Sequence, residues 1–225
     1  MLHKCNFGLI FLTCMVISYR EELESDFEGT VIDIETWGNF HKQYDDSRGY
    51  REIIPVIFGY INDERLEVRC AAWRSSLESL HSEIKEVVPR LDKPLYAFNS
   101  IFMRGVLYHS CDLVVHFDGE LNLDHKESIR KARLALGIEN YEDPFKDDRG
   151  KCVHQWDLEC RLGLGDDDSR LSIRHIRSRL LKERDILLKR GFRPPDDLKL
   201  FIGEAVITDD VEASDLVTPS SLMRY

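Results

Sequence analysis

The feature that most constrains this chain is the short apolar run from Thr30 to Ile34 (TVIDI). This run contains the acidic residue Asp33 and is followed directly by a second acidic residue, Glu35. A short β-branched run bounded by polar residues predicts a buried strand. Alternate residues of a strand point to the same face, so Asp33 and Glu35 present two carboxylates side by side. Hard oxygen ligands at that spacing suit Mg²⁺ or Mn²⁺. We prefer this interpretation to the alternative, in which Asp33 caps a turn and Glu35 is solvated.

The remaining apolar runs predict a mixed sheet flanked by helices. Leu77, Leu80, Ile84 and Val87 recur at helical spacing. Pro55 would force a bulge or an edge position on the strand that contains it. The expected order is three strands, a helix, a strand, a short helix and a strand, with helices from Lys126 onward. The expected strands are 30–34, 53–61, 66–73, 94–98 and 113–117; the expected helices are 76–88 and 102–109, and 37–51 is a loop.

Length and charge bound the class of protein. The 225 residues are enough for one domain with a sizeable core, with or without a tail. The formal net charge of −10 argues against a protein that coats duplex nucleic acid. It does not exclude a nuclease, whose metal site is itself built from carboxylates. We expect an uncertain apolar segment over 1–28, the domain over 29–193, and an extension over 194–225 that is disordered from about Asp209.

The N-terminal apolar run Phe7 to Ile17 raises the question of targeting. Crossing a bilayer takes roughly 20 apolar residues, more than this run contains. No Ala-x-Ala-type cleavage site follows it. We expect either a packed terminal element or a start codon that has been placed too far upstream. We also expect a cytoplasmic location and no membrane partner. The six cysteines form no Cys-x-x-Cys pair, which favours free thiols in a reducing compartment.

Three stretches of the chain form a pattern: Asp33 to Thr36, Leu95 to Asn99, and Leu134 to Ile138 with the residues after it. Together they resemble the DEDD 3'–5' exonucleases, in particular the predicted ribonuclease H-like nucleases of bacteria and archaea. The resemblance covers roughly residues 29 to 193. It implies an α/β fold with a ribonuclease H-like mixed five-stranded sheet flanked by helices. It also implies removal of nucleotides from a 3' end by two metal ions about 4 Å apart. The stretches are Asp33-Ile34-Glu35-Thr36; Leu95 to Asn99 with Phe102 and Leu107; and Leu134 to Ile138 with Asp143-Pro144-Phe145 and Gly150.

The later motifs depart from that family pattern. Four residues after Asn99, where the family has a metal-binding Asp, this chain has Met103. Methionine is a poor ligand for Mg²⁺. The last motif needs a Tyr or His shortly before a final Asp, and three placements stay open. These are His175 with Arg179, which fits the context best but puts Arg in the place of Asp; Leu181 with Asp185; and His154 with Glu159.

Helical geometry weighs against Asp185 as a metal ligand. Ile173, Ile176, Leu180 and Leu187 form one apolar stripe. At 100° per residue, Asp185 lies nearly opposite that stripe and Arg179 lies at its border. A ligand should face the sheet, so we expect Asp185 to be solvated.

The expected site follows from these choices. Asp33 and Glu35 hold the metals, and His154 acts as general base. Glu159 or Asp118 completes the metal ligands, although Asp118 more simply ends a strand in a glycine turn. Asn99 positions the nucleic-acid backbone. The basic stretch 170–193 tracks the phosphates of a single strand or is a solvated helix face, two interpretations that we weigh equally; its candidate contacts are Arg174, Arg177 and Lys182.

Two other classes of function stay open. The domain could be a catalytically degenerate ribonuclease H-like fold that binds nucleic acid or protein. It could also be an unrelated α/β domain in which Asp33 and Glu35 fall together by accident. Nothing in the sequence separates DNA from RNA or indicates an oligomeric state.

Overall fold

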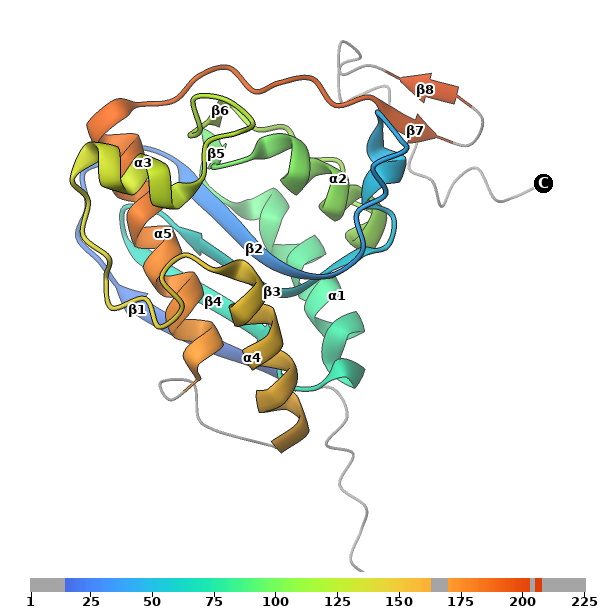
Figure 1. Cartoon of the computed structure of the whole chain (residues 1–225), viewed down its shortest axis with the longest axis horizontal. Helices are drawn as coiled ribbons and strands as arrows, with labels where there is room; N and C mark the ends of the chain where they lie inside the picture. Colours follow the sequence, from blue (N-terminus) through green and yellow to red (C-terminus); the bar gives the residue numbers. More distant parts are fainter. Residues whose placement is uncertain (1–14, 163–169, 203–204, 208–225) are drawn as a thin grey trace, which may run out of the picture.

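The computed structural model describes residues 15–162, 170–202 and 205–207. This part of the chain forms a six-stranded mixed sheet flanked by five α-helices, an α/β arrangement (Figure 1). The strand order is β1-β4-β3-β2-β5-β6, and a separate hairpin pairs β7 with β8. The strands are β1 (Val16–Glu22), β2 (Thr30–Gly38), β3 (Ile53–Ile61), β4 (Arg65–Ala71), β5 (Leu95–Ala97), β6 (Gly119–Glu120), β7 (Leu200–Ile202) and β8 (Ala205–Ile207).

Strands β2, β3 and β4 form an antiparallel meander, and β5 and β6 continue the sheet in parallel with β2. The predicted strand 53–61 is observed at those residues. The predicted irregularity at Pro55 is also confirmed, because the β2–β3 register shifts between Glu35 and Thr36, and Thr36 pairs with Pro55. Pairing of β3 with β4 ends at Ile57, so the missing N–H of Pro55 interrupts no ladder on that side.

Two sequence-based expectations about the sheet are wrong. The sheet has six strands because β1 adds to its edge beside β4, where a terminal element of unspecified type was expected. Residues 7–14 of the apolar run lie outside the described residues. Residues 113–117 are not a strand; pairing with β5 begins only at Asp118, whose N–H donates to Leu95 O at 2.8 Å. Val115 and Phe117 are buried and Val114 is exposed. The side chains of this segment therefore alternate between buried and exposed although its backbone does not pair with a strand.

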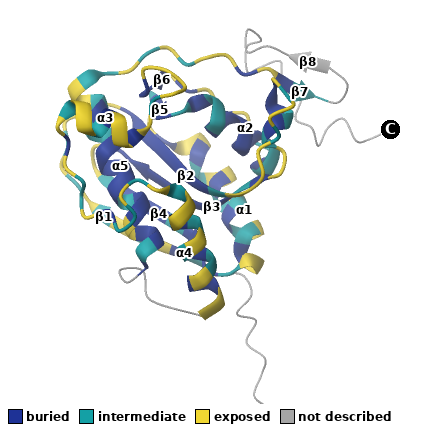
Figure 2. Ribbon diagram, in the orientation of Figure 1, coloured by how far each residue is buried: buried dark blue, intermediate teal, exposed yellow. Residues whose placement is uncertain are grey.

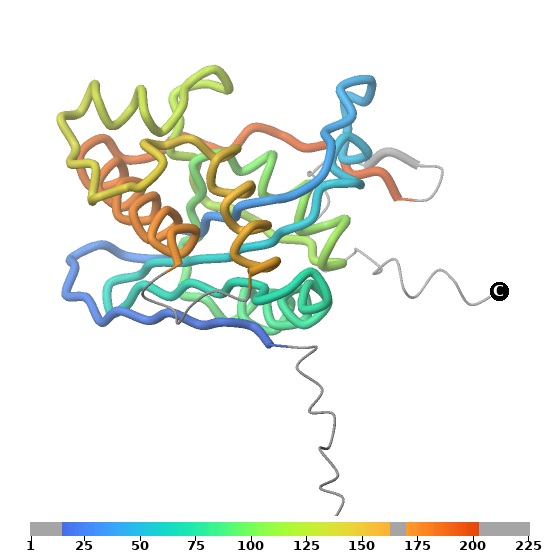
Figure 3. The backbone as a smooth tube through the Cα atoms, turned by 60° about the horizontal axis from the view of Figure 1, so that its bottom comes forward, coloured from blue at the N-terminus to red at the C-terminus, as the bar shows by residue number. Residues whose placement is uncertain are grey.

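The helices divide between the two faces of the sheet (Figure 3). On one face lie α1 (Leu77–Val87) and α2 (Ser100–Cys111), which match the predicted helices to within a few residues. On the other lie α3 (Ile129–Leu136), α4 (Arg149–Leu162) and α5 (Leu171–Arg190). Helix α5 crosses β2, β3 and β4 closely. A Cβ at Gly59 would lie 2.8 Å from Leu180 and 2.9 Å from Ile176, so a glycine is needed at that crossing.

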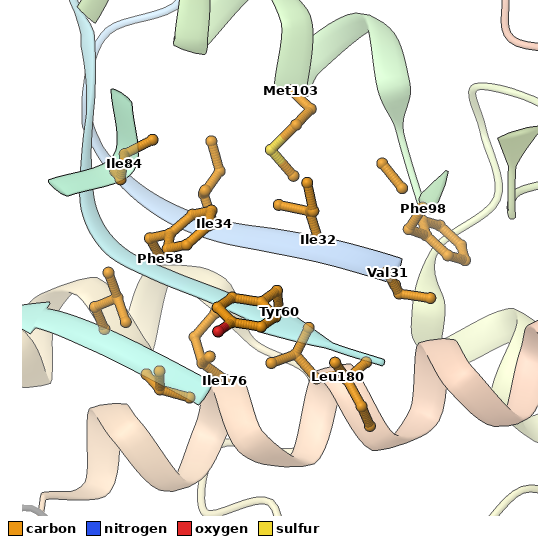
Figure 4. Close-up of a cluster of buried hydrophobic side chains, with 14 of the residues drawn as sticks. Val31, Ile32, Ile34, Phe58, Tyr60, Ile84, Phe98, Met103, Ile176 and Leu180 are labelled. Carbon is orange, nitrogen blue, oxygen red and sulfur yellow. The ribbon is translucent and has the colours of Figure 1, made fainter. Parts of the chain in front are cut away.

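The core lies on both faces of the central strands, as Figure 2 shows for β2, β3 and α5. Ile32 and Ile34 point toward α1 and α2. Met103 lies on their side of β2, and Leu180 of α5 lies on the opposite side (Figure 4). None of the described helices combines the length and apolarity that crossing a bilayer requires.

Candidate functional site

The two carboxylates predicted to share a face do so, on the face of β2 that α4 and α5 cover. They alternate with Ile32 and Ile34, whose side chains fill the opposite core. Asp33 is 2% exposed and Glu35 is 1% exposed. A buried carboxylate is costly unless a cation or several hydrogen-bond donors compensate it, so their partners define the chemistry of the site.

Those partners are two arginines from α4 and α5. Arg179 Nε lies 2.6 Å from Asp33 Oδ2 and 3.3 Å from Glu35 Oε1. Arg149 bridges the same pair from the other side. Its Nη2 donates to Asp33 Oδ1 at 2.8 Å and to the Ile34 carbonyl at 2.9 Å, and its Nε lies 3.1 Å from Glu35 Oε1. Each guanidinium therefore joins both carboxylates.

A second row of charges lies behind this pair. His175 Nδ1 lies 2.8 Å from Asp143 Oδ1, and its Nε2 lies 3.6 Å from Glu35 Oε1. Lys182 Nζ lies 2.9 Å from Asp143 Oδ2 and 2.6 Å from Asp147 Oδ1. His175 and Lys182 are both fully buried. An ion-pair network thus extends from β2 through α5 to the loop before α4.

The network sets the protonation of its members. Burial opposes ionisation of Glu35, but the positive charges of Arg149, Arg179 and His175 outweigh it and lower the Glu35 pKa to about 2. Burial also opposes protonation of His175, but its hydrogen bond with Asp143 and the negative charge of Glu35 raise its pKa. An anionic Glu35 beside a cationic His175 is the state that these shifts favour.

Glu183 is the exception in this network. It is fully buried one turn beyond Arg179, and both of its carboxylate oxygens lack hydrogen-bond partners. Its nearest cation is Arg179, with Nη2 3.6 Å from Glu183 Oε1. Burial and the negative charge of Asp33 raise the Glu183 pKa well above its usual value. The site therefore favours a neutral Glu183.

The donor set does not fit the pair of Mg²⁺ or Mn²⁺ ions that the family resemblance implies. Asp33 and Glu35 already have two guanidinium groups where divalent cations would have to bind. Met103, at the position of a metal-binding Asp, lies on the opposite face of β2. Within the described part of the chain, no three His, Cys, Asp or Glu side chains are grouped so as to hold a metal ion.

The structure does not bring the other expected catalytic residues to the carboxylate pair. Glu159 accepts hydrogen bonds from the Leu171 N–H, at 3.0 Å, and from the Ser172 hydroxyl, so it caps the start of α5. Asp118 Oδ2 accepts the Leu95 N–H at 2.7 Å, in keeping with the strand-end interpretation. His154 is exposed on α4. In the described region none of the three forms a hydrogen bond or an ion pair with Asp33 or Glu35.

The expected nucleic-acid contacts have mixed positions. Lys182 is fully buried in its ion pairs and has no surface with which to reach a nucleic acid. Arg177 pairs with Glu21 of β1, with Nε 2.5 Å from Oε2. Arg174 is exposed, and its closest carboxylate is Glu142 at 3.7 Å. Asn99 Oδ1 accepts the Phe102 N–H at 3.0 Å and caps α2.

A cavity of about 520 Å³ opens beside the carboxylate pair. It lies where the start of α2, the start of α3 and the loop leading into α4 converge. Its wall includes Asn99, Arg149 and Arg179, so the guanidinium groups that hold the carboxylates also face this space. The cavity is of a size that small-molecule sites commonly have.

Of the three placements of the last motif, the structure puts His175 and Arg179 beside Asp33 and Glu35. Asp185 instead contacts Tyr141 and Arg184, and its side chain is only 17% exposed, so the expectation that it is solvated is wrong. Sequence reasoning missed Arg149 and Glu183, and no local pattern marks either residue. The chain matches no family model, no curated protein and no solved structure.

Proposed function

We propose that this chain is a ribonuclease H-like domain that lacks the metal-dependent hydrolysis of the family it resembles and binds single-stranded nucleic acid without cutting it. One observation carries the proposal: Arg149 and Arg179 neutralise Asp33 and Glu35 from within the fold. The element order from β2 to β6, with helices on both faces, is the order that the resemblance led us to expect. The cavity beside the arginines is the candidate binding site.

The energetics favour arginine over metal at these carboxylates. A divalent ion would have to displace both guanidinium groups, and the buried Arg179 would lose its partners. Breaking a buried ion pair costs about 3–5 kcal/mol. A metal ion bound by two carboxylates alone, in competition with two covalently tethered cations, is at a disadvantage that a third and fourth carboxylate would normally offset.

The test is to incubate a 5'-labelled single strand with the protein in Mn²⁺, alongside anisotropy titrations of the same strand in EDTA. We expect binding in EDTA that weakens with added salt, and no shortening of the strand in Mn²⁺. Asp33→Asn serves as the matched control. Shortening in Mn²⁺ that Asp33→Asn abolishes would contradict the proposal and establish a metal-dependent 3'–5' exonuclease. Absence of any binding would contradict both the proposed binding of nucleic acid and the exonuclease alternative.

A further inference from the structure

The acidic residues on the cavity wall are already neutralised by cations outside it. Three acidic residues line this space, and each has a basic partner. Their charge is therefore not available to repel an anionic ligand at full strength. The pairs are Glu127 with Arg190 at 2.8 Å, Asp147 with Lys182 at 2.6 Å, and Asp148 with Lys151 at 3.4 Å.

Two basic residues on the same wall have no such partner. Arg130, in the first turn of α3, and Lys146, in the loop before α4, are exposed and line the cavity. Neither side chain forms an ion pair or a hydrogen bond with any residue that the structure describes. Arg130 and Lys146 are therefore two positive charges on the cavity wall with no carboxylate paired to them.

The floor and walls supply further recognition. Arg149 uses Nε and Nη2 to hold the carboxylates, and its Nη1 forms no hydrogen bond or ion pair with the described residues. The cavity lies at the N-terminal ends of α3 and α4, where the helix dipole adds positive potential. Phe98 and Ile129 give one side an apolar surface beside the amide of Asn99.

We propose that this cavity binds the phosphomonoester of a nucleotide or of a nucleic-acid end, with Arg130 and Lys146 as its cationic contacts and Arg149 at its base. The inference rests on the proposed nucleic-acid function and specifies its ligand. A phosphomonoester carries about −1.5 to −2 charges at neutral pH, which matches the two unpaired cations better than the single charge of an internal phosphodiester. The apolar wall and the amide suit the face and the edge of a base.

The experiment compares a short oligothymidylate carrying a 5'-phosphate, a 3'-phosphate or hydroxyls at both ends. Affinities are measured by anisotropy in EDTA, with thymidine monophosphate and a phosphoserine peptide as competitors. The variant is Arg130→Gln/Lys146→Gln. The matched control is Lys131→Gln, which removes one charge from the same helix at a residue whose ammonium donates to the Lys126 carbonyl at 3.3 Å. All three positions are exposed, so the variants should fold.

We expect one of the phosphorylated ends to bind at least about tenfold more tightly than the hydroxyl end, the equivalent of one charge-assisted hydrogen bond. The double variant should lose this advantage, and Lys131→Gln should keep it. Competition by thymidine monophosphate would identify a nucleotide site. If thymidine monophosphate does not compete, the site binds the end of a strand. Equal affinity for all ends, an advantage that survives in the double variant, or equal competition by the phosphopeptide would overturn the inference.

These outcomes are distinct from failure of the proposed function. Phosphate-dependent binding together with Mn²⁺-dependent shortening would overturn the inert-domain proposal and leave the phosphomonoester site intact. Binding without cleavage and without preference for a phosphorylated end would overturn the phosphomonoester site and leave the inert-domain proposal intact.

Discussion

Replacement of Arg179 by methionine should destabilise the protein more than replacement of Arg149, the other arginine that holds the carboxylate pair. The Arg179 side chain is 5% exposed, and those of Asp33 and Glu35 are 3% and 2% exposed. Removing the guanidinium leaves buried carboxylates undercompensated, for which the expected cost is about 3–5 kcal/mol. Arg149 holds the same carboxylates but its side chain is 39% exposed, so water can replace part of its interaction. Arg149→Met should therefore cost less, about 1–2 kcal/mol.

The measurement is urea unfolding followed by the fluorescence of the three tryptophans, of which Trp156 is fully buried and donates to the Ala71 carbonyl. Urea is chosen because it is uncharged and does not screen ion pairs. Arg174→Met, an exposed substitution in the same helix, is the control and should change the free energy of unfolding by less than about 0.5 kcal/mol. Asp33→Asn should recover part of the Arg179→Met loss. The reasoning is refuted if Arg179→Met costs no more than the control, or if Asp33→Asn deepens its loss.

Three further predictions follow from the buried titratable groups. The folded-state pKa of Glu183 is raised, so the wild-type protein should lose stability as pH rises above about 4.5. At pH 7 the free energy of unfolding of Glu183→Gln should be larger than that of the wild type by up to about 3 kcal/mol. A difference between the two proteins that does not grow with pH in urea titrations would contradict this. The folded-state pKa of His175 is raised above 6.5, so its contribution to stability should be complete below pH 6.5 and vanish as pH rises through the folded-state pKa. The free energy of unfolding of His175→Asn should lack this pH-dependent part. A difference in the free energy of unfolding between His175→Asn and the wild type that stays constant from pH 6 to 9 would refute the prediction. Burial raises the pKa of all four described thiols, so in native protein these should react with a thiol reagent far more slowly than after unfolding in urea; mass mapping of rapid native labelling to any of them would disprove the prediction.

Local periodicity was enough to predict much of the secondary structure. The alternation of Val31, Asp33 and Glu35 with Ile32 and Ile34 placed both carboxylates on one face before any tertiary contact was known. The apolar spacing of 76–88 located α1 to within a residue or two at its ends. These features depend on neighbours a few residues apart, which the chain order itself specifies.

The tertiary structure alone decided what the carboxylates contact. Asp33 meets Arg149 and Arg179 across 116 and 146 residues of chain, separations over which no periodicity carries information. The sequence of 170–193 allowed two interpretations of its basic residues, contact with phosphates or a solvated helix face. Helix α5 lies between the sheet, α3 and α4, so Lys182 and Arg179 are instead buried in ion pairs. The sequence shows which residues carry charge, but the partner of each charged residue depends on which elements pack together. That pairing decides whether the two carboxylates face metal ions or arginine side chains.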